Sequence, residues 1–239
     1  MSEKDTFSEH SKTLNDGHAQ TVQTAQTVQT AQTAANGEKN SADTMETSDF
    51  YAYLDRMKFI RRWQLMRCTR DENIMEHSQS VALFTHALCV VKNRVFGGNV
   101  DEGKAVLYAV YHETAEVMTG DLPTPVKYYN RGIHGAYKDL ETLACEKITA
   151  TLPPELRGGI APYVFADESS EEYKIVKAAD RLSAYVKCLE ELRCGNNEFL
   201  KAKASIEADL HARNMPEVEY FFSRFVKGFS MTLDELESL

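Results

Sequence analysis

Apolar residues recur at helical spacing from residue 48 onward. Phe50, Leu54 and Met57 follow the i, i+4, i+7 pattern of an amphipathic helix. A second helix is predicted by a longer series at the same spacing: His77, Val81, Phe84, Leu88 and Val91. A third is expected to begin after Asp101, a favourable N-cap. Its apolar side comprises Val106, Ala109, Val110 and Val117.

The rest of the chain continues this pattern. Further helices are predicted at about 134–151, 171–194 and 198–213, with two shorter ones near the C-terminus. The words "GDLPTP", "FGGN" and "CGNN" are typical of helix stops and turns, and alternating strand patterns are absent. The sequence therefore predicts a single all-α domain.

The N-terminal part has a different pattern. Residues 20–34 are five triplets, QTV-QTA-QTV-QTA-QTA, whose period of three fits neither a helix nor a strand. Few large apolar residues precede Phe50, so this part cannot bury enough surface to offset the entropy lost on ordering. We predict a disordered low-complexity tail over 1–46 and a folded domain over 47–239.

The charge and the cysteine content limit which binding partners and which cellular compartment are expected for this chain. The formal charge is -9, which argues against binding to a nucleic-acid polymer or an anionic membrane. The longest apolar stretch, "VALFTHALCVV", is too short to span a bilayer. Five scattered cysteines form no C-x-x-C pair and are typical of reduced thiols. We expect a cytoplasmic protein that does not enter membranes.

Several polar residues fall where apolar ones are expected. His77 lies on the apolar stripe of its helix and is either a core histidine bonded to a carbonyl or a ligand. If the third helix is continuous, His112, Glu113 and Glu116 lie within about 100° of one another beside its apolar side. Carboxylates that face a core are costly unless they are paired or bind a cation. Three such residues favour a metal site.

Asp180 is a fourth candidate, at the edge of an apolar helical face. Taken alone, its position favours a helix-surface ion pair with Lys177 or Arg181. Two imidazoles and two carboxylates together suit one divalent ion such as Mn²⁺, Fe²⁺, Co²⁺, Ni²⁺ or Zn²⁺. The word "HETAE" departs from the protease motif H-E-x-x-H, because its fifth residue is Glu116.

Longer sequence motifs around these residues resemble those of a known protein family. A histidine, a later histidine next to an acid and a distant aspartate resemble the metal ligands of HD-domain phosphohydrolases. The words "RRWQLMR", "ENIMEHSQSVA", "YHETAEVMTGDLPTPVKYYN", "KAADRLSAYVKCLEEL" and "GNNEF" resemble, in order, the YfbR-type bacterial 5'-deoxynucleotidases. The resemblance covers the chain from about residue 48 to the C-terminus.

The resemblance implies a helical bundle around a single metal ion, assembled as a homodimer. It implies the metal ligands His77, His112, Glu113 and Asp180. It implies a catalytic role for Glu116, and the chemistry of the side chains adds Arg62, whose planar fork can clamp phosphate oxygens, and Asp121, which can protonate the leaving oxygen. The implied substrate contacts are Arg62, Trp63, His77, Glu113, Asp121, Leu122, Pro123 and Thr124.

One residue departs from the family pattern. The histidine of the motif is usually followed by Asp, whereas this chain has Glu113, which is longer by one methylene. The charge and the ligand atoms are kept. The helix must then sit back slightly, or the carboxylate must coordinate through two oxygens instead of one.

The function expected from the resemblance is hydrolysis of 2'-deoxynucleoside 5'-monophosphates. Two alternatives remain open: an HD phosphohydrolase for nucleoside triphosphates or cyclic nucleotides, and a non-catalytic domain that binds metal or nucleotide for regulation. Three residues also keep simpler explanations. Glu116 would bond to a metal ligand, Asp121 would stabilise a turn, and Trp63 would pack in the core.

Overall fold

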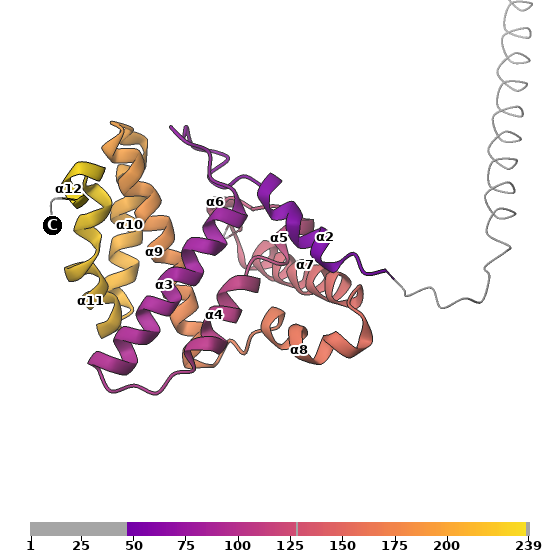
Figure 1. Ribbon diagram of the computed structural model, residues 1–239. Coiled ribbons are helices and arrows are strands. Elements are labelled where there is room, and N and C mark those ends of the chain that lie inside the picture. Colours follow the sequence, from indigo (N-terminus) through magenta and orange to yellow (C-terminus); the bar gives the residue numbers. More distant parts are fainter. Residues whose placement is uncertain (1–46, 128, 238–239) are drawn as a thin grey trace, which may run out of the picture. The chain divides into compact units, whose positions relative to one another are not determined.

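The computed structural model describes residues 47–127 and 129–237, and this part of the chain contains helices without any strand beyond an isolated bridge between Arg61 and Asn73 (Figure 1). The all-α prediction is confirmed. The α-helices are α2 (Phe50–Asp55), α3 (Ile74–Val95), α4 (Glu102–Tyr111), α5 (Glu116–Thr119), α6 (Thr124–Lys127), α7 (Arg131–Ala150), α8 (Pro154–Val164), α9 (Glu171–Arg193), α10 (Leu200–Ala212), α11 (Pro216–Arg224) and α12 (Leu233–Glu237). Short 3₁₀ helices are η1 (Arg56–Phe59), η2 (Asn197–Phe199) and η3 (Val226–Ser230).

Helix α9 forms the centre of the bundle. Helices α3, α4 and α10 pack against it, with α11 on α3. Figure 1 shows α10, α11 and α12 on one side of α3 and α9, and α7 and α8 on the other. Leu88, Leu182 and Leu210 in this core are 0% exposed. Each fully buried leucine stabilises the fold by roughly 1.5–3 kcal/mol, so apolar burial holds α3 and α9 in register.

Side-chain caps fix where the long helices begin. The Asp101 carboxylate accepts a hydrogen bond from the Lys104 amide at 2.9 Å, which confirms its predicted role at the start of α4. Asn73 caps α3 and Ser170 caps α9 in the same way. These caps satisfy amide groups that have no partner inside a helix.

The predicted third helix is interrupted. Helix α4 ends at Tyr111, residues 112–115 form a turn, and α5 begins at Glu116. The His112 ring bonds to the Ala109 carbonyl, and the Thr114 hydroxyl donates to the Tyr111 carbonyl, both at 2.7 Å. These side chains occupy carbonyls that would accept the next helical amides, so the backbone tightens to i, i+3 bonds. The expectation of one continuous helix through Val117 was wrong.

Two helices lie where none was expected. Helix α6 begins within "GDLPTP", and α8 begins at Pro154, a residue that fits the first helical position because it needs no amide partner. A small apolar cluster of Phe50, Ile148 and Leu152 packs on Tyr111 and joins α2 and α7 beside the 112–115 turn.

Two predictions concern the ends and the surroundings of this domain. The tail predicted at 1–46 lies outside the described residues, and its disorder stays a prediction. Within 47–127 and 129–237, no helix is both long and apolar enough to cross a bilayer.

Candidate metal centre

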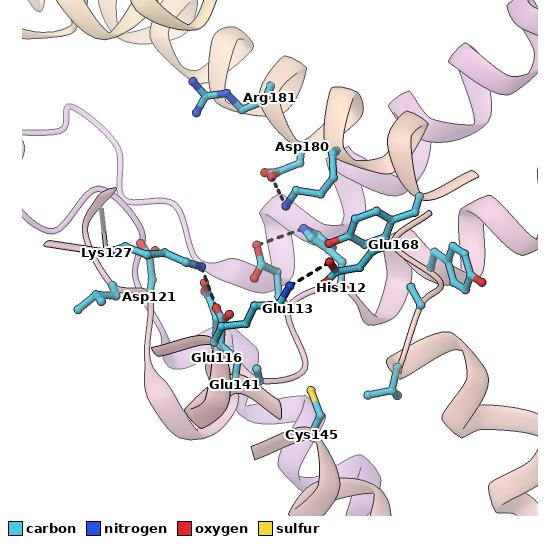
Figure 2. A pocket seen from close by; sticks show the side chains of 18 of the residues that line it. His112, Glu113, Glu116, Asp121, Lys127, Glu141, Cys145, Glu168, Asp180 and Arg181 are labelled. Atoms are coloured by element: carbon cyan, nitrogen blue, oxygen red, sulfur yellow. Dashed lines mark hydrogen bonds and ion pairs between the residues drawn. The ribbon is translucent and has the colours of Figure 1, made fainter. Parts of the chain in front are cut away.

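Four predicted ligands meet at one point between the central helices. His77 comes from α3, His112 and Glu113 from the turn after α4, and Asp180 from α9. One ligand atom of each lies within 4.8 Å of those of the other three. In Figure 2, Asp180 points from its helix toward Glu113 and His112. Packing of three helices thus brings together residues that are up to 103 positions apart in the sequence.

The His112 ring is held in one orientation. Its Nδ1 lies 2.7 Å from the Ala109 carbonyl oxygen, which accepts only, so Nδ1 carries the proton. The buried Nε2 then presents a lone pair 3.1 Å from Glu113 Oε1 and has no hydrogen-bond partner among the described residues. Two such atoms repel unless a proton or a shared cation lies between them. Four ligand atoms within 4.8 Å fit a shared cation.

His77 is bonded on the other side of its ring. It is 0% exposed, and Nε2 lies 3.1 Å from Asp180 Oδ1. Its Nδ1 lies 2.8 Å from an Arg62 nitrogen and 3.1 Å from the Ser183 hydroxyl. A histidine that binds metal through Nε2 carries its proton on Nδ1, where Ser183 is the available acceptor. Sequence reasoning missed Ser183, which has no motif of its own.

Both proposed carboxylate ligands are charged in this setting. Burial would raise the pKa of Asp180, but the Lys177 ammonium and the nearby imidazoles hold it well below its usual range. Burial acts likewise on Glu113, and His112 and His77 lower its pKa well below the usual range. Asp180 makes both contacts that the sequence suggested for it. Its Oδ2 pairs with Lys177 at 3.1 Å, and its Oδ1 faces the His77 ring in the ligand set. Such anionic oxygens attract a divalent ion.

Arg181 is not the partner of Asp180. Its guanidinium pairs instead with Asp209 at 3.0 Å. The alternative ion pair considered for Asp180 therefore holds for Lys177 alone.

Glu116 and Asp121 lie beside the ligand set. Glu116 is buried, and its Oε2 has no hydrogen-bond partner among the described residues. Burial first and the Glu113 carboxylate second raise the pKa of Glu116 to about 10. Burial also raises the pKa of Asp121, against the lowering effect of Arg62. Within the described part of the chain the Asp121 carboxylate caps no backbone amide, so the turn-stabilising explanation is not supported.

A cavity of about 730 Å³ opens over this site. This volume lies within the range of about 300–1,000 Å³ usual for small-molecule sites. Its walls include most of the predicted site residues: Arg62, His112, Glu113, Glu116, Asp121, Leu122, Thr124 and Asp180. Trp63, His77 and Pro123 are not on its wall. Trp63 lines a neighbouring pocket of about 530 Å³ together with Arg62.

The segment that carries Arg62 and Trp63 is strained. Trp63 has a φ of 61°, in the left-handed region that a bulky residue adopts only at a cost on the order of 1–3 kcal/mol. Its indole packs on Phe199 with ring centroids 5.3 Å apart and donates to Glu72 at 2.9 Å. Trp63 therefore packs against the core, as one of its two predicted roles required, and also makes a polar contact with Glu72. Sequence reasoning did not single out Glu72, although it opens "ENIMEHSQSVA".

Solved structures share this fold. An HD-domain phosphohydrolase from Listeria innocua superposes with a TM-score of 0.67 at 20% identity, over 79% of this chain and 92% of that one. An HD phosphohydrolase of cyanophage S-2L, DatZ, bound to dA and one catalytic Zn²⁺ ion, superposes with a TM-score of 0.55 at 21% identity, over 77% and 99%. The helical bundle with its two histidines and two carboxylates defines an HD-domain phosphohydrolase fold.

Sequence similarity narrows this class to one family. The family model for YfbR-like 5'-deoxynucleotidases matches residues 49–229. The 5'-deoxynucleotidase YfbR of Escherichia coli, from strain K12 / DH10B and likewise from O157:H7, is 52% identical over 195 residues. The match spans 80% of this chain and 97% of that protein. The chain belongs to the YfbR-like 5'-deoxynucleotidase family, as its motifs predicted.

Proposed function

We propose that this chain hydrolyses 2'-deoxynucleoside 5'-monophosphates to deoxynucleosides and phosphate with one divalent metal ion. The observation that carries the proposal is the His112 lone pair facing Glu113 Oε1 at 3.1 Å, inside a set of four convergent ligand atoms. The E. coli relatives named 5'-deoxynucleotidase and the dA- and zinc-bound DatZ support the substrate class and the metal.

The metal ligands in this proposal are His77, His112, Glu113 and Asp180. An ion of the Mn, Fe, Co, Ni or Zn class fits a mixed imidazole and carboxylate set. Such an ion supplies a Lewis acid that polarises a phosphoryl oxygen and acidifies water. His77 is fully buried, so it serves here as a ligand and not as the substrate contact implied by the resemblance.

Arg62 binds the phosphate. Its guanidinium lines the cavity next to the ligand set, and its side chain is 14% exposed. A planar fork of donors clamps two phosphate oxygens and follows their charge into the transition state, which a lysine does less well.

Glu116 and Asp121 carry out the proton transfers of the reaction. As water adds to phosphorus and the bond to the 5' oxygen breaks, one proton leaves the water and one must reach that oxygen. Glu116, whose carboxyl group a bound cation would ionise, orients the water and passes on its proton, and Asp121 protonates the 5' oxygen or binds the sugar. Both carboxyl groups line the cavity, and Figure 2 shows both on the same side of Glu113.

Residues 121–124 border the sugar inside the cavity, and Trp63 borders it from the neighbouring pocket, which Arg62 also lines. Leu122 and Thr124 line the cavity, and Pro123 connects them at the start of α6. A wall too close to C2' to admit a hydroxyl gives the preference for deoxyribose. Glu113 borders the substrate from the metal side.

The test is phosphate release from dAMP, dGMP, dCMP, dTMP and dUMP, with AMP as the ribose control, after chelation and resupply of single metals. We expect release from the deoxynucleotides that depends on the metal. No release with any metal would remove the nucleotidase proposal in favour of a regulatory binding domain. Equal release from AMP would remove the deoxyribose preference only, and preferential attack on dATP or a cyclic nucleotide would change the substrate class.

We also propose that the enzyme is a cytoplasmic homodimer whose catalytic domain is 47–239. All five cysteines are free thiols, which suits a reducing compartment. Ile133, Leu140 and Leu143 project exposed from one face of α7 and give a second copy an apolar surface. Light scattering on the purified protein tests the dimer, and an unchanged rate after removal of 1–46 tests the domain boundary.

A further inference from the structure

The Arg62–Trp63 pair belongs to an irregular segment, residues 60–73, whose ends are held together by a hydrogen bond from the Ile74 amide to the Ile60 carbonyl at 3.0 Å. Near its C-terminal end, the Glu191 carboxylate on α9 accepts from the Thr69 amide at 2.8 Å, and Lys187 donates to the Arg70 carbonyl at 2.7 Å. These contacts fix the backbone of the segment and leave the Arg62 and Trp63 side chains to be oriented by something else.

A single carboxylate oxygen orients both side chains. Glu72 is 8% exposed, and its Oε2 accepts from an Arg62 nitrogen and from the Trp63 indole nitrogen, each at 2.9 Å. The Glu72 carbonyl also accepts from the Arg62 amide at 2.9 Å. One residue therefore fixes the angle between the guanidinium and the indole.

The second hydrogen bond of Arg62 forms only when His77 carries no proton on Nδ1. The same Arg62 nitrogen lies 2.8 Å from His77 Nδ1, which must accept because a guanidinium only donates. When Nδ1 carries a proton, as metal binding through Nε2 requires, this bond is lost and Glu72 remains. Glu72 is the anchor of Arg62 that does not change with the histidine.

We propose that Glu72 is a positioning residue that locks Arg62 and Trp63 to each other, and so sets both phosphate affinity and the discrimination of deoxyribose from ribose. The inference rests on the proposed function, in which Arg62 holds the phosphate and Trp63 borders the sugar. Glu72 does not touch substrate. It acts by holding the indole of the left-handed Trp63 beside the Arg62 guanidinium, whose central carbon lies 5.8 Å from the Trp63 ring centroid.

The test compares Glu72→Gln with Glu76→Gln. Glu76 lies in the first turn of α3, four residues after Glu72, and pairs with the exposed Arg70 at 2.9 Å, so Glu76→Gln is the matched loss of one negative charge. In Glu72→Gln the amide oxygen can still accept from both donors but carries no charge, so the hydrogen bonds from the Arg62 guanidinium and the Trp63 indole weaken. We expect KM to rise and the ratio of kcat/KM for dAMP over AMP to fall, each by about 10-fold or more. Metal content and the Glu76→Gln variant are expected to stay near the parent values, and kcat is expected to fall less than kcat/KM, because Arg62 also follows the phosphate charge into the transition state.

Trp63 supplies a second measurement, because it is the only tryptophan in the chain. We expect Glu72→Gln, but not Glu76→Gln, to raise acrylamide quenching of its fluorescence and to weaken the signal change when inorganic phosphate or dTMP is added. This measurement does not need turnover, so a chain without nucleotidase activity still reports on Glu72. An unchanged ratio together with unchanged fluorescence overturns the proposal, as does loss of metal or of kcat alone. If Glu72→Ala fails to fold, Glu72→Gln still decides.

Discussion

The metal ligands and the 60–73 segment are neighbours built by different means. The ligands His77 and Asp180 lie on α3 and α9, two long helices that apolar burial holds in register. The 60–73 segment has no helix, and hydrogen bonds to buried charges hold it. A site on packed helices tolerates the loss of one polar contact elsewhere. A loop that is held by few polar contacts changes its conformation when one of them is lost. The two regions are therefore expected to respond differently to substitution.

The largest effect is expected at a ligand. His112→Ala removes a fixed lone pair from the ligand set, so the chain should lose its metal, and activity should fall on the order of 10³-fold or more. Metal content after dialysis and phosphate release measure this. His86→Ala, an exposed histidine on α3, is the control and should change neither. An active His112→Ala protein without metal would contradict the ligand assignment.

Glu116→Gln separates proton handling from metal binding. The amide keeps the shape of the side chain but cannot exchange a proton, so kcat should fall about 10²- to 10⁴-fold while the metal stays bound. Glu141→Gln is the control, because Glu141 lines the same cavity and pairs with Lys127. Loss of metal from Glu116→Gln would instead favour the alternative in which Glu116 supports a ligand.

Glu191→Gln tests the polar anchoring of the 60–73 segment. It leaves the buried Lys187 ammonium without a charged partner, which should lower the free energy of unfolding by about 3–5 kcal/mol at neutral pH. Despite burial, hydrogen bonds from Lys187, Asn196 and Thr69 lower the pKa of Glu191 to about 2 from an ordinary 4.5.

The pH dependence of that effect has a definite sign. With a lowered pKa in the folded state, the contribution of Glu191 is complete above pH 4.5 and is lost as the pH falls toward 2. The difference between parent and Glu191→Gln should shrink over this range in urea unfolding curves. Glu198→Gln, an exposed carboxylate beside the segment, should stay within about 0.5 kcal/mol of the parent. A constant difference across pH would contradict this assignment.

The smallest effect is expected for Glu113→Asp. The carboxylate of Glu113 already reaches His112 and His77, with Oε1 at 3.1 Å and 3.5 Å from their Nε2 atoms. Shortening it by one methylene should shift the relative affinities for Mn²⁺, Co²⁺ and Zn²⁺ by about 10-fold or less, because charge and donor atoms are unchanged. Calorimetric titration with each metal measures the shift. Identical affinities would show that the longer side chain has no influence on metal choice.

The fold was largely predictable because its signals are local. The 74–95 and 171–193 helices follow from apolar spacing, and Asp101 from its capping chemistry. The ligand residues stood out because polar groups on apolar faces are costly. The turn at 112–115 was missed, since the bonds from His112 and Thr114 to nearby carbonyls compete with a helix that the spacing also allows.

The sequence by itself determined the helices, the polar interruptions in their apolar faces and the words that place the chain in its family. Only the tertiary structure decided which of those polar groups meet. Ser183 at His77 and Glu72 between Arg62 and Trp63 follow no local period, whereas Lys177 lies three residues before Asp180 on the same helix. The physical reason is that helix periodicity fixes a side chain's direction within its own element, while ligand distances and shared hydrogen bonds depend on how separate elements pack.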